Sequence, residues 1–179
     1  LETSGETTVT VIVKKEEETS LTMPVNSLRF ALVSVFIALI GCDVPMFQQS
    51  HQLPNKNWEI GNTIKFDVEV SDTMSGYDFY IDLRTETGYP YANIYMFVNT
   101  TFPSGKTARD TVECILADHT GRWLGSGLGD IKDNHILFKD NVRFPNTGTY
   151  TFEFEQGMRT ESLSSILDVG ISLENHKKQ

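Results

Sequence analysis

The chain is poor in cysteine: only Cys42 and Cys114 occur in 179 residues. A framework of several disulfides, on which many small exported domains depend, is therefore excluded. Cys114 lies in the largely apolar stretch 112–116. A cysteine in that setting is expected to be a small buried hydrophobic residue rather than a reactive thiol.

Basic residues are also scarce, with 15 Lys and Arg against 24 Asp and Glu and a formal net charge of −9. Nucleic-acid binding depends on neutralising phosphates with basic side chains. The charge balance therefore predicts no nucleic-acid partner, and it argues against direct docking on anionic lipid headgroups.

Motifs for metal binding or catalysis are absent. The histidines are scattered, at His51, His119, His135 and His176, and they form neither an HExxH motif nor a paired Cys/His spacing. No G-x-S-x-G elbow occurs. The glycine-rich segment 121–130 lacks the Lys-Ser/Thr pair of a phosphate loop. The sequence thus predicts no cofactor, no metal site and no catalytic residue.

Long hydrophobic runs are missing too, because the apolar stretch 30–40 has only eleven residues. A bilayer span needs about 20, whereas an export signal needs a core of this length behind a positive residue, here Arg29. The stretch ends in Leu39-Ile40-Gly41-Cys42, a lipobox. Cys42 is therefore the predicted lipidation site, and acyl chains contributing about 0.8 kcal/mol per buried methylene would hold it on a membrane.

Four segments follow from this reading. Residues 1–22 include the acidic run Glu16-Glu17-Glu18, which does not suit a positive signal start, so Met23 is the expected first residue. Residues 1–22 are then either not part of the translated protein, because the start codon was assigned too far upstream, or a tail that is removed. Residues 23–41 are the lipoprotein signal peptide, 42–57 a polar lipidated tether, and 58–179 a single domain.

Within that domain, apolar and polar residues alternate with the period of a half-buried strand. The candidate strands are 64–71, 77–84, 92–99, 107–117, 136–144 with a break near Asp140, 149–156 and 169–173. One short helix is expected over 160–167. The pattern predicts an all-β fold, an antiparallel β-sandwich of jelly-roll type with one short helix.

Three sets of residues are candidates for function. The first is a contact surface formed by Arg122, Trp123, Gly125, Gly127 and Gly129. Alternatively, these residues only set the shape of a loop. A sugar-stacking platform is the second possibility, from Trp58, Tyr77, Tyr80, Tyr89, Tyr91, Tyr95 and Trp123. The third is the pair Glu153 and Glu155, which lie on one strand face as the carboxylates of an envelope hydrolase would.

Taken together, several segments resemble the family of gliding motility lipoproteins GldH of Bacteroidota. They are Asp82-Leu83-Arg84, Tyr89-Pro90-Tyr91-Ala92-Asn93, Asp110-Thr111-Val112-Glu113 with Leu116-Ala117-Asp118, the run 121–131, and Gln156-Gly157-Met158-Arg159 with Leu163, Ile166 and Asp168-Val169-Gly170. The resemblance covers nearly all of the chain after Cys42.

The resemblance implies a non-enzymatic lipoprotein of the cell envelope, expected in the outer membrane, that is needed for surface gliding. It also implies other gliding and type 9 secretion proteins of the envelope as partners. A surface glycan-binding lipoprotein is the alternative function, and an envelope hydrolase is a further one.

Overall fold

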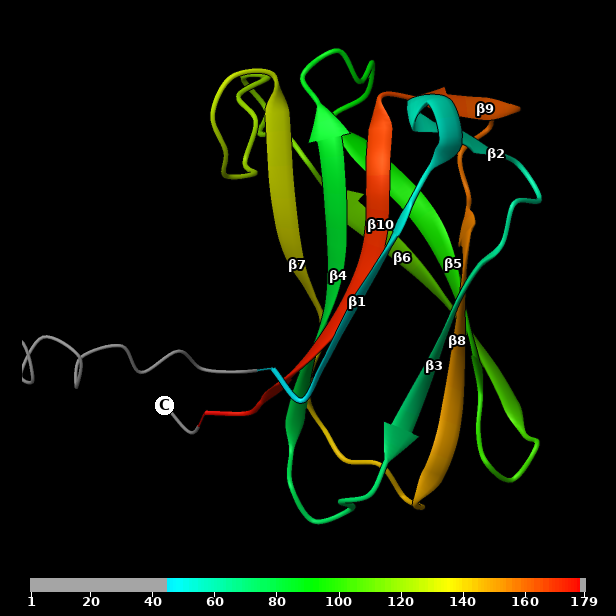
Figure 1. Cartoon of the computed structure of the whole chain (residues 1–179). Helices are drawn as coiled ribbons and strands as arrows, with labels where there is room; N and C mark the ends of the chain where they lie inside the picture. Colours follow the sequence, from blue (N-terminus) through cyan, green and yellow to red (C-terminus); the bar gives the residue numbers. More distant parts are fainter. Residues whose placement is uncertain (1–44, 178–179) are drawn as a thin grey trace, which may run out of the picture. The chain divides into compact units, whose positions relative to one another are not determined.

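Two four-stranded antiparallel sheets face each other in the computed structural model, which describes residues 45–177 (Figure 1). Cys42 and the segments 1–22 and 23–41 lie outside the described residues. One sheet has the order β1-β10-β4-β7 and the other the order β3-β8-β5-β6. Consecutive strands of the two sheets cross from one sheet to the other, except for β5 and β6, which pair in the same sheet. β1 pairs with β10, as the first and last strands of a jelly roll do. The predicted all-β sandwich is confirmed.

Seven of the eight strands in the two sheets correspond to strands expected from the sequence, although β7 begins five residues earlier than expected, and β1 was not expected. The first sheet contains β1 (Phe47–Gln52), β10 (Ile166–Asn175), β4 (Tyr77–Glu86) and β7 (Ile131–Val142). The second contains β3 (Ile64–Val70), β8 (Gly148–Gln156), β5 (Asn93–Thr101) and β6 (Thr107–Ile115). A separate two-stranded ribbon pairs β2 (Asn57–Glu59) with β9 (Ser162–Ser164).

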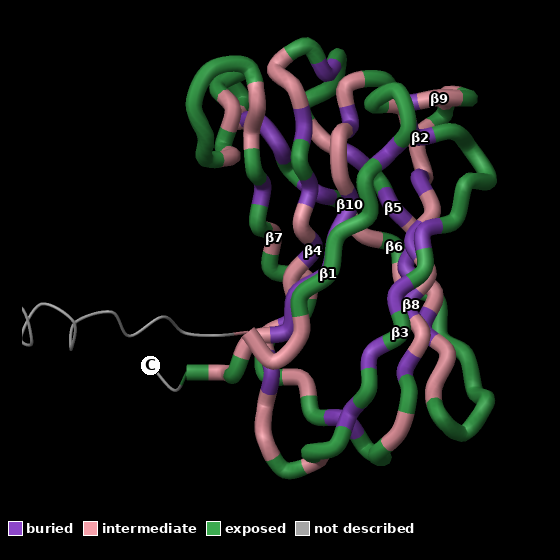
Figure 2. The backbone as a smooth tube through the Cα atoms, viewed as in Figure 1, coloured by how far each residue is buried: buried purple, intermediate pink, exposed green. Residues whose placement is uncertain are grey.

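The core lies between the inner faces of the sheets, where buried residues alternate with more exposed ones along β3, β4, β5 and β8 (Figure 2). Phe66 of β3 and Phe154 of β8 are buried and meet edge to face, with ring centroids 5.4 Å apart. From the opposite sheet, Phe79 packs edge to face on Phe152 at 4.9 Å. The first contact lies within one sheet, and the second joins the two sheets; both place the rings on the buried faces of their strands.

The prediction of a short helix over 160–167 is wrong. Residues Ser162–Ser164 form β9, Ser165 has a φ of +65°, and Ile166 begins β10. Leu163 and Ile166 are both buried, three residues apart, and that spacing fits a helix face as well as two consecutive strands. Within residues 45–177 the one helical turn is the 3-10 turn Pro54–Lys56.

The structure also places the start of the domain earlier than residue 58. Residues 47–52 of the expected tether form β1, which pairs with β10 from Phe47 opposite Leu173 to Gln52 opposite Asp168. Most of β1 is exposed, so main-chain hydrogen bonds rather than an apolar face hold it. Among residues 45–177 no helix has the length and apolar character needed to cross a bilayer.

Candidate functional site

The glycine-rich segment joins the free edges of the two sheets. It lies between β6 of one sheet and β7 of the other, and we call residues 121–130 the glycine loop. Leu124 N–H donates to Leu116 O at 2.9 Å, and Ser126 exchanges two main-chain hydrogen bonds with Asp133 at 2.9 and 2.8 Å. The loop therefore closes the end of the sandwich where β7 begins.

Asp118 organises the entry to the glycine loop. Its carboxylate accepts hydrogen bonds from the hydroxyl and amide of Thr120 at 2.6 and 2.9 Å and from the amide of Arg122 at 3.1 Å. Arg122 Nε also lies 3.1 Å from Asp118 Oδ2. Led by the Thr120 hydroxyl bond, these contacts lower the pKa of Asp118 to about 2. Arg122 thus takes part in a turn while most of its side chain stays in water.

The other predicted residues of the loop have identifiable structural roles. Trp123 is partly buried against the core. A Cβ on Gly125 would lie 2.5 Å from Asn134 Oδ1, and one on Gly127 would lie 2.6 Å from Ile131 O. Gly129 has a φ of +66° but open space around it. Close packing on β7 therefore requires the first two glycines, and backbone conformation favours the third.

Two leucines that we did not single out from the sequence are the exposed apolar residues of this loop. Leu128 is 97% exposed and Leu124 is 53% exposed. With Ile115, Gly125 and Ile136, Leu124 lines a hollow of about 410 Å³, which we call the loop hollow. The sequence could have indicated the exposure of Leu128, since this apolar residue stands between Gly127 and Gly129. Two flanking glycines favour a loop, and a residue in such a loop is not buried by a strand or helix.

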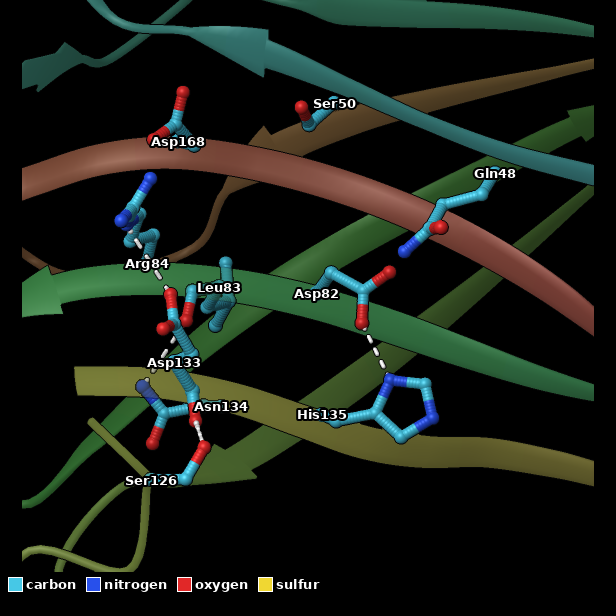
Figure 3. A pocket seen from close by; sticks show the side chains of 10 residues that line it. All are labelled: Gln48, Ser50, Asp82, Leu83, Arg84, Ser126, Asp133, Asn134, His135 and Asp168. Atoms are coloured by element: carbon cyan, nitrogen blue, oxygen red, sulfur yellow. Dashed lines mark hydrogen bonds and ion pairs between the residues drawn. The ribbon is translucent and has the colours of Figure 1, made fainter. Parts of the chain in front are cut away.

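A polar hollow of about 350 Å³ lies on the outer face of the β1-β10-β4-β7 sheet (Figure 3). Asp82 is 2.6 Å from His135 Nδ1 and accepts a 2.6 Å hydrogen bond from Ser172, while Arg84 pairs with Asp133 at 3.2 Å. The aspartate stands between the serine and the histidine. This order differs from a catalytic triad, in which the histidine receives the proton of the serine.

Glu153 and Glu155 project from β8 on the outer face of the second sheet. Glu155 is held by Arg109 at 3.1 Å and by the amide of Asn99 at 2.9 Å. The Arg109 guanidinium also lies 4.2 Å from the centre of the Phe97 ring. Glu155 is thereby engaged in an ion pair on a sheet surface rather than facing Glu153 across a cleft.

The aromatic residues of the predicted sugar platform do not form a single surface. Trp58, Tyr77 and Tyr89 are buried, and Tyr80 stacks on His135 with ring centroids 3.9 Å apart. Tyr91 and Tyr95 are exposed, and together with Gly157, Met158 and Arg159 they line a third hollow of about 530 Å³. We call this the tyrosine hollow.

Cys114 is fully buried, as expected, and burial raises its pKa to about 12. Its sulfur lies 3.9 Å from that of Met96. Within residues 45–177, no group of three or more His, Cys, Asp and Glu side chains is arranged to hold a metal ion.

Comparison with known proteins gives a consistent result. Residues 45–173 match a family model described as GldH lipoprotein. The gliding motility lipoprotein GldH of Flavobacterium johnsoniae is 30% identical over 150 residues, 80% of this chain and 93% of the relative. A protein described as its homolog in Christiangramia forsetii is 29% identical over 152 residues, 81% of this chain and 93% of the relative. A solved structure of infectious bursal disease virus matches with a TM-score of 0.27 and 11% identity, over 73% of this chain and 31% of that one.

Proposed function

Because the chain belongs to the GldH lipoprotein family, we propose that it supports gliding motility and the linked type 9 secretion machinery from the outer membrane, through contacts with other envelope proteins. Family membership itself implies a lipid-anchored protein of the cell envelope with a role in gliding. The lipid on Cys42, the outer membrane and the protein contacts are the added parts of the proposal.

The spacing between Cys42 and the first strand supports a domain held close to the membrane. Cys42 precedes Phe47, the start of β1, by five residues. Even fully extended, five residues span at most about 18 Å. The end of the sandwich where β1 starts would therefore face the lipid.

Strand register places the glycine loop at the other end. Phe47 lies in a row with Leu173 and Phe79, whereas the loop enters β7 at Ile131, which pairs with Glu86. Seven residues of β4 separate the two rows, or about 23 Å at 3.3 Å per residue. An anchored sandwich would thus present the glycine loop away from the membrane.

Leu128 is the observation that carries the proposed contact. An almost fully exposed leucine at the tip of a loop remains in water in the isolated domain, and a partner that covers it gains about 1.5–3 kcal/mol from its burial. Leu124 and Ile115, both about half exposed, lie along the loop hollow and would extend the contact.

The test replaces Leu128 with aspartate in the gene of the source bacterium. Met74 provides a matched control, because it is 83% exposed and lies in the turn between β3 and β4, at the end where β1 starts. We expect Leu128→Asp to abolish colony spreading and Met74→Asp to preserve it, with equal amounts of both variants in the membrane fraction.

Two results would contradict the proposal. Normal spreading of Leu128→Asp would remove the loop contact, and normal spreading and adhesin secretion after gene deletion would remove the motility function. Two separate experiments test the anchor. Mass spectrometry of the N-terminal peptide should show the lipid on Cys42, and Cys42→Ser should release the protein from the membrane.

A further inference from the structure

Two segments about 65 residues apart in the sequence meet at the tyrosine hollow. Tyr91 lies two residues before β5, Tyr95 lies near its start, and Gly157, Met158 and Arg159 come from the segment after β8. Gly157 N–H donates to Tyr95 O at 2.7 Å, and Tyr95 N–H points at the Met158 sulfur at 3.3 Å. A Cβ on Gly157 would lie 3.2 Å from Tyr95 O and 3.3 Å from the Phe97 ring, so glycine permits this close approach.

The segment after β8 is pinned by a buried amide. Gln156 is almost fully buried, and its side chain accepts a hydrogen bond from Met158 N–H at 2.9 Å and donates one to Thr160 O at 2.9 Å. A single side chain therefore fixes both ends of the turn that carries Arg159. A wall held in this way needs little reorganisation when a ligand binds.

Both exposed rings are also held in place. Tyr91 is 41% exposed and packs edge to face on the buried ring of Tyr89 at 5.6 Å. Tyr95 is 40% exposed, and a hydrogen bond to Glu113 raises the pKa of its hydroxyl. Glu113 in turn accepts a 2.6 Å hydrogen bond from the amide of Asn93. The two rings thus offer preformed apolar faces at the surface.

Arg159 supplies a free donor group beside these rings. It is exposed, and no described residue accepts a hydrogen bond from its guanidinium or forms an ion pair with it. Glu113 lies across from Tyr95 in the sheet, beside the hollow rather than in its lining, and its carboxylate is an acceptor next to the rim. The hollow therefore has aromatic faces and a donor in its lining and an acceptor of opposite charge at its edge.

Those properties match one class of small molecule. The C–H face of a pyranose ring packs on an aromatic ring, while its hydroxyl groups need both donors and acceptors at the rim. The nearby Glu113 carboxylate and the net charge of −9 disfavour a polyanion. A volume of about 530 Å³ is within the range of small-ligand pockets.

We propose that the tyrosine hollow binds a neutral saccharide, with a sugar ring on Tyr91 or Tyr95 and its hydroxyls on Arg159 and Glu113. This activity is separate from the motility function, and neither depends on the other. It relocates the sugar platform considered from the sequence to two of the seven aromatic residues.

The experiment uses the full lipidated protein in a detergent without a sugar headgroup. Glucose, galactose, mannose and their β-1,4- and α-1,4-linked disaccharides are titrated by saturation-transfer NMR and calorimetry. At least one should bind. We expect Tyr95→Ala and Arg159→Met to weaken it about tenfold or more, and Tyr95→Phe, which keeps the ring, to weaken it less than Tyr95→Ala.

Tyr80→Ala is the matched control, because it removes a surface tyrosine from the other sheet and should leave affinity unchanged. Tyr91→Ala serves if Tyr95→Ala fails to fold. No transfer to any neutral saccharide would overturn the proposal, as would equal affinity in the wild type and both tyrosine variants. Binding only of glucuronic acid, or only of a proline-rich peptide titrated in parallel, would also overturn it.

Discussion

Replacing Gly127 with alanine tests whether the glycine loop owes its composition to packing. Gly127 has a φ of +125°, and an added Cβ would lie 2.6 Å from Ile131 O, an atom of the β7 backbone. The unfavourable backbone conformation costs about 1–3 kcal/mol, and the strand must also shift. We expect Gly127→Ala to lose about 3 kcal/mol of unfolding free energy or more.

Gly129→Ala and Gly105→Ala are the controls. Their φ values are +66° and +80°, and neither Cβ would meet an atom within 4 Å. Each should cost about 1–2 kcal/mol from backbone conformation alone. For a domain of this size, 1 kcal/mol corresponds to roughly 4 °C. Thermal unfolding should therefore show a loss of about 10 °C for Gly127→Ala and about half that for the controls.

One result would refute this reasoning. If Gly127→Ala unfolded at the same temperature as Gly129→Ala, the close approach to Ile131 would not constrain the loop. If it also abolished colony spreading while remaining folded, the glycine itself would belong to a contact surface.

Three further predictions concern the rest of the domain. The Cys114 thiol, with a pKa of about 12, should resist a thiol reagent at pH 8 in the native protein and react fully in denaturant; rapid native labelling would contradict its burial. The folded pKa of Asp118 is about 2, below its ordinary 3.8, so the ionised carboxylate stabilises the folded domain above about pH 4, and this contribution is lost as the pH falls toward 2. The melting temperatures of wild type and Asp118→Asn should therefore converge near pH 2. A difference that stays constant with pH would show another cause. Phe154→Ala should cost about 3–5 kcal/mol in guanidinium unfolding, against about 0.5 or less for Met74→Ala, and similar losses would contradict the assigned core.

The sequence identified the central strands well because burial on one face imposes a period of two. In β8, Tyr150, Phe152 and Phe154 are buried and the intervening residues are not. The edge strand β1 carries no such signal, because its partners are main-chain atoms of β10. The segment around Leu163 was assigned to a helix because only pairing with the distant β2 distinguishes it from one.

The candidate sites were less accessible to sequence reasoning. Composition singled out the glycine loop as a candidate, and its role as a contact surface stays a prediction. The packing of Gly125 and Gly127 was not accessible from composition, because it depends on the positions of Asn134 and Ile131 in a neighbouring strand. The tyrosine hollow depends on contacts between residues 91–95 and 157–159. No local pattern encodes such a meeting, because the strand order that creates it is a property of the whole sandwich.

The pairing of β1 with β10 has a mechanical consequence. A cell that moves over a surface pulls against its envelope proteins, and with the lipid on Cys42 the force would enter this domain at Phe47. It would act along the axis of β1 and at right angles to the hydrogen bonds between Phe47 and Gln52 and their partners in β10. Those bonds would be loaded in shear, all together, rather than peeled apart in turn. Pulling single molecules between residues 42 and 128 should therefore require a higher rupture force than pulling between residues 53 and 128, which loads the same strand from its opposite end and peels it.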